Sequence, residues 1–339
     1  MKIKLIVKTN SKNYPIFIGK HLLKDVKNIF KVEKINFEKC LIVADKNVPK
    51  KNLFILKRNI KCKKIIIHTF DATEKNKNLK SVNKILDRLL KNNFSRNDCL
   101  VSLGGGITGD ISGFAASIFK RGIKFVNVAT TLLSMVDSSV GGKQGYNTDD
   151  GKNLIGSFYQ PDCVISDINL LNSLPKREII CGYGEILKHS IISSKKKFIF
   201  LDKYKSKILS LKSPYIEKTI LESCKIKKNI VQQDEKERNL RKVLNLGHTF
   251  AHAYEATLNY SKKLNHGEAV IFGIKTAAKF SYEENLLSKK KFNLISSHID
   301  NLDINQRFKN IINKKNLKKI LKFMKSDKKN KSKYINLIL

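Results

Sequence analysis

The residues best suited to hold a metal lie in the second half of the chain. Three of the seven histidines fall between residues 248 and 266. His248 and His252 stand four positions apart in the segment LNLGHTFAHAYEATL, with Glu255 one turn beyond. On a helix this spacing places both imidazoles on one face, so spacing alone predicts a pair of zinc ligands. For either histidine taken singly, a purely structural role is the better expectation.

Two other segments of the same half carry possible ligands. His266 opens the segment HGEAVIFGIKTAAKF, and Glu185 lies in GYGEILKHS. A carboxylate and two imidazoles from separate helices would form a three-ligand site with an open position, which is the form that a catalytic zinc takes. Periodicity does not decide which two histidines join Glu185.

A glycine-rich turn in the first half is suited to bind a phosphate. The apolar run Cys99–Leu103 leads into Gly104–Gly106, and apolar residues then recur at helical spacing. This order predicts a strand, a tight turn and a helix whose first N–H groups can face an anion such as a nucleotide pyrophosphate. Gly104, Gly106 and Gly109 also match GxGxxG, but earlier strands precede them and no acidic residue lies about 20 positions on. Taken alone, a turn without a ligand is equally expected.

A second anion site is expected a little further along the chain. Small, charged and flexible positions follow one another there, and a structural loop rarely needs two lysines beside so many glycines. The residues concerned are Asp137, Ser138, Gly141, Gly142, Lys143, Lys152 and Asn153.

The elements that must position these groups follow a βαβ rhythm. An amphipathic helix is predicted from Leu79 to Leu90, and strands are predicted at Ile3–Val7, Ile16–Ile18, Cys40–Ala44, Lys64–His68, Cys99–Leu103 and Phe125–Val128. The first half is therefore predicted to be a parallel sheet with helices on both sides. Asp45 follows a strand end, where it could bind a ribose hydroxyl or simply cap a turn. Thr130 and Thr131 could cap the next helix or contact a ligand.

The character of the chain changes after Pro175, because periodic apolar positions then dominate. We therefore expect an α/β domain at residues 1–177, with the glycine turn, and an all-α domain at residues 178–339. The lysine-heavy stretch from Lys309 to Lys333 has apolar positions at helical spacing, and we interpret it as a solvated helix face.

Composition narrows the class of protein. The chain has 339 residues, enough for two domains, and no apolar stretch of the roughly 20 residues that a bilayer span needs. Its six cysteines are scattered without a CxxC pair and no signal peptide is evident, which predicts reduced thiols in a cytoplasmic protein. The net charge of +38 would suit a nucleic-acid partner. Lysine is spread along the whole chain, however, so a solvated surface is favoured.

With these residues in view, the chain resembles the 3-dehydroquinate synthase family over nearly its whole length. The motifs that carry the resemblance occur in family order. They are LGGGITGDISGFAA, KRGI, TTLLSMVDSSVGGK, GKNLIG, SLPKRE, GEILK, DEKERNLRKVLNLGHTFAHA and HGEAV. Four departures stand out, namely Ala129 for proline, Ala72–Thr73 for Asp-Gly, Gln144 for threonine and Asn239 for glycine; at the last, asparagine tolerates a positive φ.

The resemblance implies a zinc or cobalt ion held by Glu185, His248 and His266, which leaves His252 beside the substrate. It implies a site for NAD formed by Asp45, Glu74, Lys77, Gly104, Gly105, Gly106, Ile107, Thr108, Gly109, Asp110, Thr130, Thr131, Lys143, Lys152, Leu170, Leu171, Asn172 and Ser173. It implies substrate contacts from Arg121, Asp137, Asn153, Lys188, Lys227, Arg241, Asn245 and His252, with Lys328 or Lys329 closing over a carboxylate or phosphate.

The reaction that the resemblance implies is a cyclising elimination of the shikimate pathway to the aromatic amino acids. 3-Deoxy-D-arabino-heptulosonate 7-phosphate is oxidised at C5 by NAD, loses phosphate, regains the hydride and closes to 3-dehydroquinate by an intramolecular aldol step. A homodimer without nucleic-acid or membrane partners is expected. The alternatives are a metal-dependent polyol dehydrogenase, a cyclase acting on another heptulose phosphate, and a basic nucleic-acid-binding protein.

Overall fold

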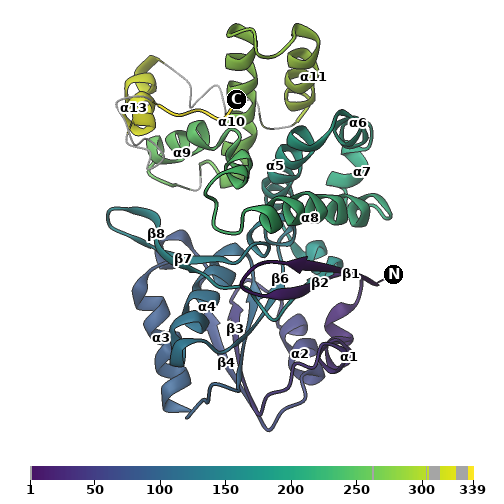
Figure 1. Ribbon diagram of the computed structural model, residues 1–339, viewed down its shortest axis with the longest axis vertical. Coiled ribbons are helices and arrows are strands. Elements are labelled where there is room, and N and C mark those ends of the chain that lie inside the picture. Colours follow the sequence, from purple (N-terminus) through teal and green to yellow (C-terminus); the bar gives the residue numbers. More distant parts are fainter. Residues whose placement is uncertain (1, 262, 303, 305–313, 326–334) are drawn as a thin grey trace. The chain divides into compact units, whose positions relative to one another are not determined.

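The computed structural model describes residues 2–261, 263–302, 304, 314–325 and 335–339. The chain divides into two compact units (Figure 1). Unit 1 comprises residues 1–179 and 210–236, and unit 2 comprises residues 180–209 and 237–339. The expected boundary after residue 177 lies close to the first division, but the structure returns residues 210–236 to unit 1.

Unit 1 is built on a seven-stranded sheet with the order β1-β2-β9-β6-β5-β3-β4. The strands are β1 (Lys2–Lys8), β2 (Asn13–Gly19), β3 (Lys39–Asp45), β4 (Lys64–Phe70), β5 (Cys99–Gly104), β6 (Lys124–Ala129) and β9 (Cys163–Asp167). The two predicted N-terminal strands, β1 and β2, pair antiparallel, and every other pairing in this sheet is parallel. The predicted α/β sheet is confirmed.

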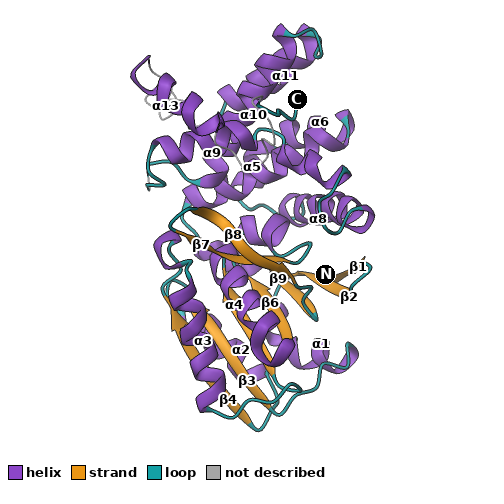
Figure 2. Ribbon diagram, turned by 60° about the vertical axis from the view of Figure 1, so that its left-hand side comes forward, coloured by secondary structure: helices purple, strands orange, loops and turns teal. Residues whose placement is uncertain are grey.

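Helices cover both faces of this sheet (Figure 2). They are α1 (Val26–Val32), α2 (Lys50–Asn59), α3 (Leu79–Lys91) and α4 (Gly106–Ile118). Residues of α3 and α4 share one core with Leu41 and Val43 of β3 and with Leu100 of β5. Because β4 and β5 lie on opposite sides of β3, the strand order reverses at β3, and the carboxyl edge there is where open α/β sheets bind ligands.

Short elements complete the carboxyl edge of unit 1. The 3-10 helix η2 (Glu74–Asn76) follows β4, the π-helical turn η4 (Ser134–Ser138) follows β6, and the 3-10 helix η5 (Ile168–Ser173) follows β9. A two-stranded sheet of β7 (Lys143–Thr148) and β8 (Gly151–Phe158) stands where a loop was expected. Helix α8 (Tyr215–Gln233) also belongs to unit 1, where it packs on η4, β1 and β2.

Unit 2 is helical in its described residues, as the apolar periodicity predicted. Most of α5 (Lys176–Ser193), with α6 (Lys195–Lys203) and α7 (Lys205–Leu209), forms its first part. Its second part holds η6 (Leu240–Asn245), α9 (His248–Thr257), α10 (His266–Glu283), α11 (Lys289–Asp300) and α13 (Lys314–Lys325). Helix α10 packs against α9 and α11, and α13 packs against α9. Helix α13 lies within the stretch Lys309–Lys333 that was expected to form a solvated lysine-rich helix, and the rest of that stretch lies outside the described residues.

Candidate metal centre and cofactor edge

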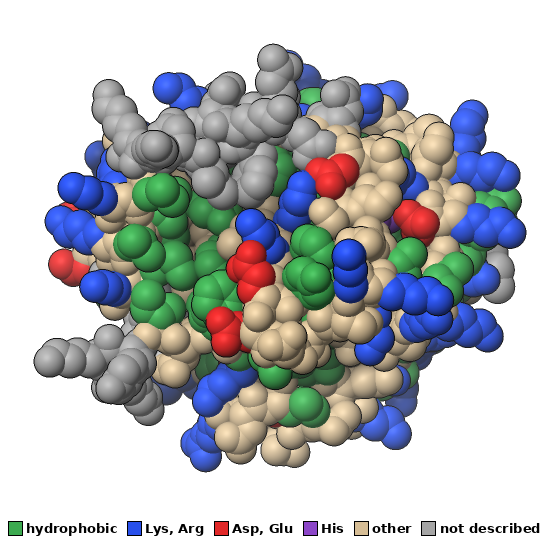
Figure 3. Space-filling view, turned by 90° about the horizontal axis from the view of Figure 1, so that it is seen from above, with side chains coloured by type: hydrophobic (Ala, Val, Ile, Leu, Met, Phe, Trp, Pro, Cys, Tyr) green, Lys and Arg blue, Asp and Glu red, His purple; other side chains and the backbone are tan. Residues whose placement is uncertain are grey.

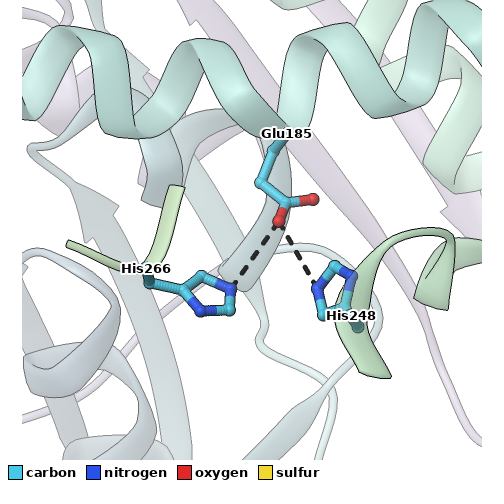
Figure 4. A group of neighbouring side chains, drawn as sticks. All are labelled: Glu185, His248 and His266. Carbon is cyan, nitrogen blue, oxygen red and sulfur yellow. Dashed lines mark ion pairs between the residues drawn. The ribbon is translucent and has the colours of Figure 1, made fainter. Parts of the chain in front are cut away.

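Three side chains of unit 2 converge on one point. Glu185 on α5, His248 on α9 and His266 on α10 each offer a ligand atom, and these atoms lie within 4.8 Å of one another. Glu185 Oε1 is 3.6 Å from His248 Nε2 and 3.7 Å from His266 Nε2 (Figure 4). Two donors bound to one tetrahedral zinc lie roughly 3.3 Å apart. The donor types and separations therefore fit a divalent metal.

The environment of Glu185 also fits a cation. Its side chain is buried, and neither carboxylate oxygen accepts a hydrogen bond in the described part of the chain. The buried ammonium of Lys188, one turn along α5, forms an ion pair with Oε2. A buried carboxylate loses most of its hydration, so it requires compensating charge or coordination. Oε1 faces the two imidazoles, as expected for a metal ligand.

Backbone features fix both histidines at the first residue of a helix. Gly247, just before α9, adopts φ 77°, a left-handed conformation that glycine reaches without strain. At the start of α10, Glu268 Oε2 accepts a hydrogen bond from the Asn265 N–H at 2.9 Å. This contact is one half of a capping box, and it stops the helix from beginning earlier.

Glycines allow the three helices to approach closely enough for their ligands to meet. A Cβ at Gly267 of α10 would overlap the backbone of Cys181 on α5, and one at Gly184 would press on the Gly267 carbonyl. A Cβ at Gly273 of α10 would overlap the Gly247 carbonyl at the start of α9. The helix backbones are therefore in direct contact at these points.

His252 lies beside this group without being part of it. Its ring centroid is 5.5 Å from that of His248 and 6.2 Å from that of His266. The three-residue group contains Glu185 and His266 in its place. The pair of ligands that i, i+4 spacing predicted is therefore not the set that the structure brings together.

The residues predicted to bind NAD follow the carboxyl ends of the parallel strands of unit 1. Asp45 ends β3, Glu74 and Lys77 follow β4, Gly104–Gly106 follow β5, Thr130 and Thr131 follow β6, and Leu170–Ser173 follow β9. Because parallel strands end at one edge of a sheet, these groups lie along a common edge. The Thr130 N–H donates to the Gly104 carbonyl at 2.9 Å, which joins two of the turns directly.

A polar network links this edge to the β7–β8 hairpin. Lys77 Nζ donates to Asp110 Oδ2 at 2.5 Å and to Asn153 Oδ1 at 2.6 Å. Glu74 Oε1 accepts from Asn147 Nδ2 at 2.7 Å and lies 3.6 Å from Lys152 Nζ. Lys77 and Asp110 were predicted for the cofactor and Asn153 for the substrate, so the structure places both groups in one network.

Two carboxylates at this edge have shifted pKa values. Burial raises the pKa of Asp110 above its ordinary value, although the Lys77 ammonium opposes that shift. Burial also raises the pKa of Asp45, against hydrogen bonds from the backbone and side chain of Asn47. Partly buried acids whose pKa values are perturbed in this way are common at binding sites.

The glycine turn itself is tightly packed. A Cβ at Gly104 would overlap the Thr108 side chain, and a Cβ at Gly105 or Gly106 would come within 3.0 Å of Thr131 or Ser138. The turn follows the fifth strand of the chain, so the GxGxxG match does lack the first-strand context of the common dinucleotide fold.

The predicted substrate residues of unit 1 are not all together. Lys227 of α8 donates from Nζ to the Asp137 carboxylate at 2.6 Å and to its backbone carbonyl at 2.7 Å. Arg121 is exposed and lies between α4 and β6, at the amino end of β6. It is therefore at the opposite edge of the sheet from the glycine turn, and unit 1 does not bring it to the other predicted residues.

In unit 2, the remaining predicted residues surround the segment that precedes α9. Arg241 is 2% exposed, and Asn245 Nδ2 donates to Glu237 Oε1 at 2.7 Å. Both lie in the 3-10 helix η6. Asn239 has φ −137°, so the positive φ considered for this position does not occur. Lys328 and Lys329 lie outside the described residues.

Three polar residues in these networks were not predicted as site residues. Asn147 bonds Glu74 and also accepts from the Asn153 N–H at 3.0 Å, Glu237 bonds Asn245, and Glu255 bonds His266. Glu255 carried a usable signal, because it stands seven residues after His248 and shares its helix face. Asn147 and Glu237 lie in segments without periodicity, and nothing in the sequence singled them out.

Family models match most of the chain. The model for the N-terminal part of 3-dehydroquinate synthase matches residues 67–181, and the model for the C-terminal part matches residues 182–330. A 3-dehydroquinate synthase of Pelagibacter ubique is 59% identical over 337 residues, covering 99% of this chain and 92% of that protein. One from Alkaliphilus metalliredigens is 40% identical over 341 residues, with coverage of 99% and 92%.

A solved structure of 2-deoxy-scyllo-inosose synthase, in complex with carbaglucose-6-phosphate, NAD+ and Co2+, superimposes with a TM-score of 0.85. It is 26% identical and covers 99% of this chain and 89% of that one. The two-part fold, the two family models and the full-length relatives lead to one assignment. The chain belongs to the 3-dehydroquinate synthase family of enzymes.

Proposed function

We propose that this enzyme converts 3-deoxy-D-arabino-heptulosonate 7-phosphate into 3-dehydroquinate and phosphate, with a transiently reduced NAD and a divalent metal. The proposal is supported by the 59% identity to a 3-dehydroquinate synthase along nearly the full chain. The observation that carries it is the convergence of Glu185, His248 and His266 in a chain with this family's motifs. When bound, NAD supplies a reversible hydride acceptor and the metal supplies Lewis acidity.

We propose that Glu185, His248 and His266 hold the metal. One carboxylate and two neutral imidazoles suit zinc, and cobalt accepts the same ligands. Three protein ligands leave a coordination position for a substrate oxygen. The ammonium of Lys188 forms an ion pair with Oε2 of Glu185, which leaves Oε1 directed toward the two imidazoles.

We propose that the carboxyl edge of unit 1 binds NAD. The N–H groups at the start of α4 would receive the pyrophosphate, because a helix N-terminus favours negative charge. The raised pKa of Asp110 and its contact with Lys77 indicate a polar group kept away from water, suited to orient an uncharged amide or hydroxyl of a ligand. The other predicted cofactor residues follow the same strand ends.

The proposed substrate contacts divide by charge. Lys227, Lys188 and Arg241 are buried cations that can bind a phosphate or carboxylate, while Asn245 and His252 offer neutral donors. Lys227 is already oriented by Asp137 at 2.6 Å, so it would lose little freedom on binding. Buried cations of this kind convert binding energy into orientation of the reacting carbons.

Three further parts of the proposal concern the whole protein. The metal in use is zinc or cobalt, the protein is a homodimer, and it acts in the cytoplasm. All six cysteines are free thiols, which is consistent with a reducing compartment. Metal analysis of the purified protein tests the first part, and light scattering tests the second.

The assay that tests the proposed function compares phosphate with NADH. Purified protein is incubated with the heptulosonate phosphate, NAD and zinc, and both species are followed in time. We expect phosphate release equal to 3-dehydroquinate formation, with no accumulation of NADH. A polyol dehydrogenase would instead produce one NADH per turnover without phosphate, and that result would overturn the proposal. Chelator-treated protein serves as the control and should regain activity with added metal.

A further inference from the structure

Both ring nitrogens of His266 face a carboxylate. Nε2 is directed toward Glu185, at 3.7 Å from Oε1, while Nδ1 lies 3.0 Å from Oε2 of Glu255. Glu255 lies on α9 and is 5% exposed. The family resemblance gives this residue no role, yet its carboxylate contacts the ring of a proposed metal ligand from outside the ligand set.

The hydrogen-bond partners define which nitrogen carries the hydrogen. An ionised carboxylate can only accept, so the contact with Glu255 requires hydrogen on Nδ1 of His266. His248 follows the same rule, because its Nδ1 lies 3.3 Å from the Leu246 carbonyl oxygen, which is also only an acceptor. Each neutral imidazole then has its lone pair on Nε2, the atom directed toward Glu185.

Helix α9 carries groups that position both His248 and His266. It provides His248 at its first residue and Glu255 seven residues later, two turns along the same face. Helix α10 begins at His266, which Glu255 contacts from the side. Movement of α9 would therefore displace one ligand directly and release the ring of the other.

We propose that Glu255 is a positioning residue of the metal centre. It holds the His266 imidazole as the Nδ1–H tautomer, with Nε2 presented to the metal, and it increases the basicity of that nitrogen through a charged hydrogen bond. The inference rests on the proposed metal ligands, and it goes beyond them by assigning a function to a residue that touches neither metal nor substrate.

Metal affinity tests this role separately from activity. Zinc affinity of chelator-treated protein is measured by competition with a chromophoric chelator, for wild type, Glu255→Gln and Glu255→Ala. Loss of such an outer partner typically weakens metal binding about 10- to 100-fold. We expect the loss of zinc affinity to be about 100-fold in Glu255→Ala and about 10-fold in Glu255→Gln. The glutamine variant loses less because its amide oxygen still accepts a hydrogen bond. The visible spectrum of the cobalt-loaded Glu255→Ala protein should also change.

The chain offers a matched control. Asp202 makes the same kind of contact to Nδ1 of His298, at 2.7 Å, in the same unit, and His298 is not one of the proposed metal ligands. Asp202→Asn should leave zinc affinity within about twofold of wild type, a change small beside that from an outer ligand partner. Glu255 variants that bind zinc as tightly as wild type, while His266→Ala does not, would overturn the positioning role. If His266→Ala itself retains full affinity, the proposed metal ligands are wrong instead.

A measurement on the wild-type protein tests the proposal even if the variants fail to fold. Nitrogen-15 spectra of the histidine rings in the metal-free wild type report the tautomer directly, with His266→Ala used to assign the signal. We expect hydrogen on Nδ1 of His266. A ring with its hydrogen on Nε2 would contradict the proposal.

Discussion

The histidines of unit 2 differ in what their ring nitrogens contact. His248 and His266 direct Nε2 toward Glu185, whereas His298 is enclosed between protein groups. The Tyr183 hydroxyl lies 2.8 Å from His298 Nε2, and Asp202 lies 2.7 Å from its Nδ1. The first two rings therefore have the arrangement that the proposed metal site needs, whereas the third has a protein partner at each ring nitrogen.

The first prediction at this scale concerns His248. Replacing it by alanine removes one of three ligands, so we expect His248→Ala to lose both metal binding and turnover. Metal content after dialysis and phosphate release are the measurements. A variant with full zinc occupancy and full activity would show that His248 is not a ligand. His21→Ala, which changes an exposed histidine in unit 1, is the control.

The second prediction concerns pH. Burial lowers the pKa of His298 from its ordinary 6.5, although the Asp202 carboxylate opposes that shift. Because the folded protein resists protonating this ring, its contribution to stability is complete above pH 6.5 and is lost as the pH falls toward the lower folded pKa. We expect the unfolding midpoint in urea to fall over this range, and to fall less in His298→Gln. Equal pH dependence in both proteins would contradict this assignment.

The residue types that could bind a metal were predictable from the sequence, but the three residues that the structure brings together were not. Glu185, His248, His252 and His266 were all recognised as candidates. Helix periodicity specifies neighbours within one helix, whereas His266 reaches the centre through contacts between helices. Only the resemblance to the family favoured His266 over His252, and the structure brings His266 together with Glu185 and His248.

At the scale of elements, the metal centre depends on how closely the helices of unit 2 approach. Gly267 of α10 packs against the backbone of α5, and Gly273 packs against the residue before α9. Each contact brings one ligand-bearing helix against another. The spacing of the three proposed ligands therefore depends on these two glycines.

We predict that Gly267→Ala weakens both stability and metal binding. The added Cβ would overlap the Cys181 backbone, so α5 and α10 must move apart and separate Glu185 from His266. Overpacking of this kind typically costs about 1–3 kcal/mol. Thermal unfolding and chelator competition are the measurements, and Lys279→Ala, at an exposed position of α10, is the control. Unchanged zinc affinity in Gly267→Ala would show that the centre tolerates helix movement.

A further element-scale prediction concerns Lys77, which joins the segment after β4 to α4 and β8. Lys77→Met leaves Asp110 without its ion-pair partner, so we expect lower stability as well as weaker NAD binding. Lys77→Met combined with Asp110→Asn removes the uncompensated charge, and should recover stability without recovering NAD affinity. Calorimetric titration with NAD and thermal unfolding separate the two effects. Wild-type NAD affinity in Lys77→Met would remove this residue from the proposed cofactor site.

Most strands and helices were predictable because their apolar spacing is clear. The β7–β8 hairpin was not, since Gly145 and Gly156 pair across it and interrupt the alternation that marks a strand. The placement of α8 was also missed. Its apolar residues Ile216, Ile220 and Cys224 show that it is a helix, but periodicity does not say which core the helix joins.

For the whole molecule, the basic residues are spread along the sequence. The net charge is +38, yet Figure 3 shows lysine and arginine side chains scattered around the face in view, with hydrophobic and acidic side chains among them. Proteins that bind nucleic acids concentrate such charge on one surface. Membership in the 3-dehydroquinate synthase family accounts for the sequence motifs, and it does not require a nucleic-acid partner to explain the net charge. No helix in the described residues is long and apolar enough to cross a bilayer.

Isotope retention shows whether the cofactor is reduced and reoxidised within one turnover. The enzyme is given substrate with deuterium at C5, together with excess unlabelled NAD and zinc, and the product is examined by mass spectrometry and NMR. We predict 3-dehydroquinate that retains the deuterium at the same carbon, released phosphate in equal amount, and no deuterium in free NADH. Deuterium in free NADH, or phosphate release with loss of the label from the product, would contradict a cofactor that is reduced and reoxidised within one turnover.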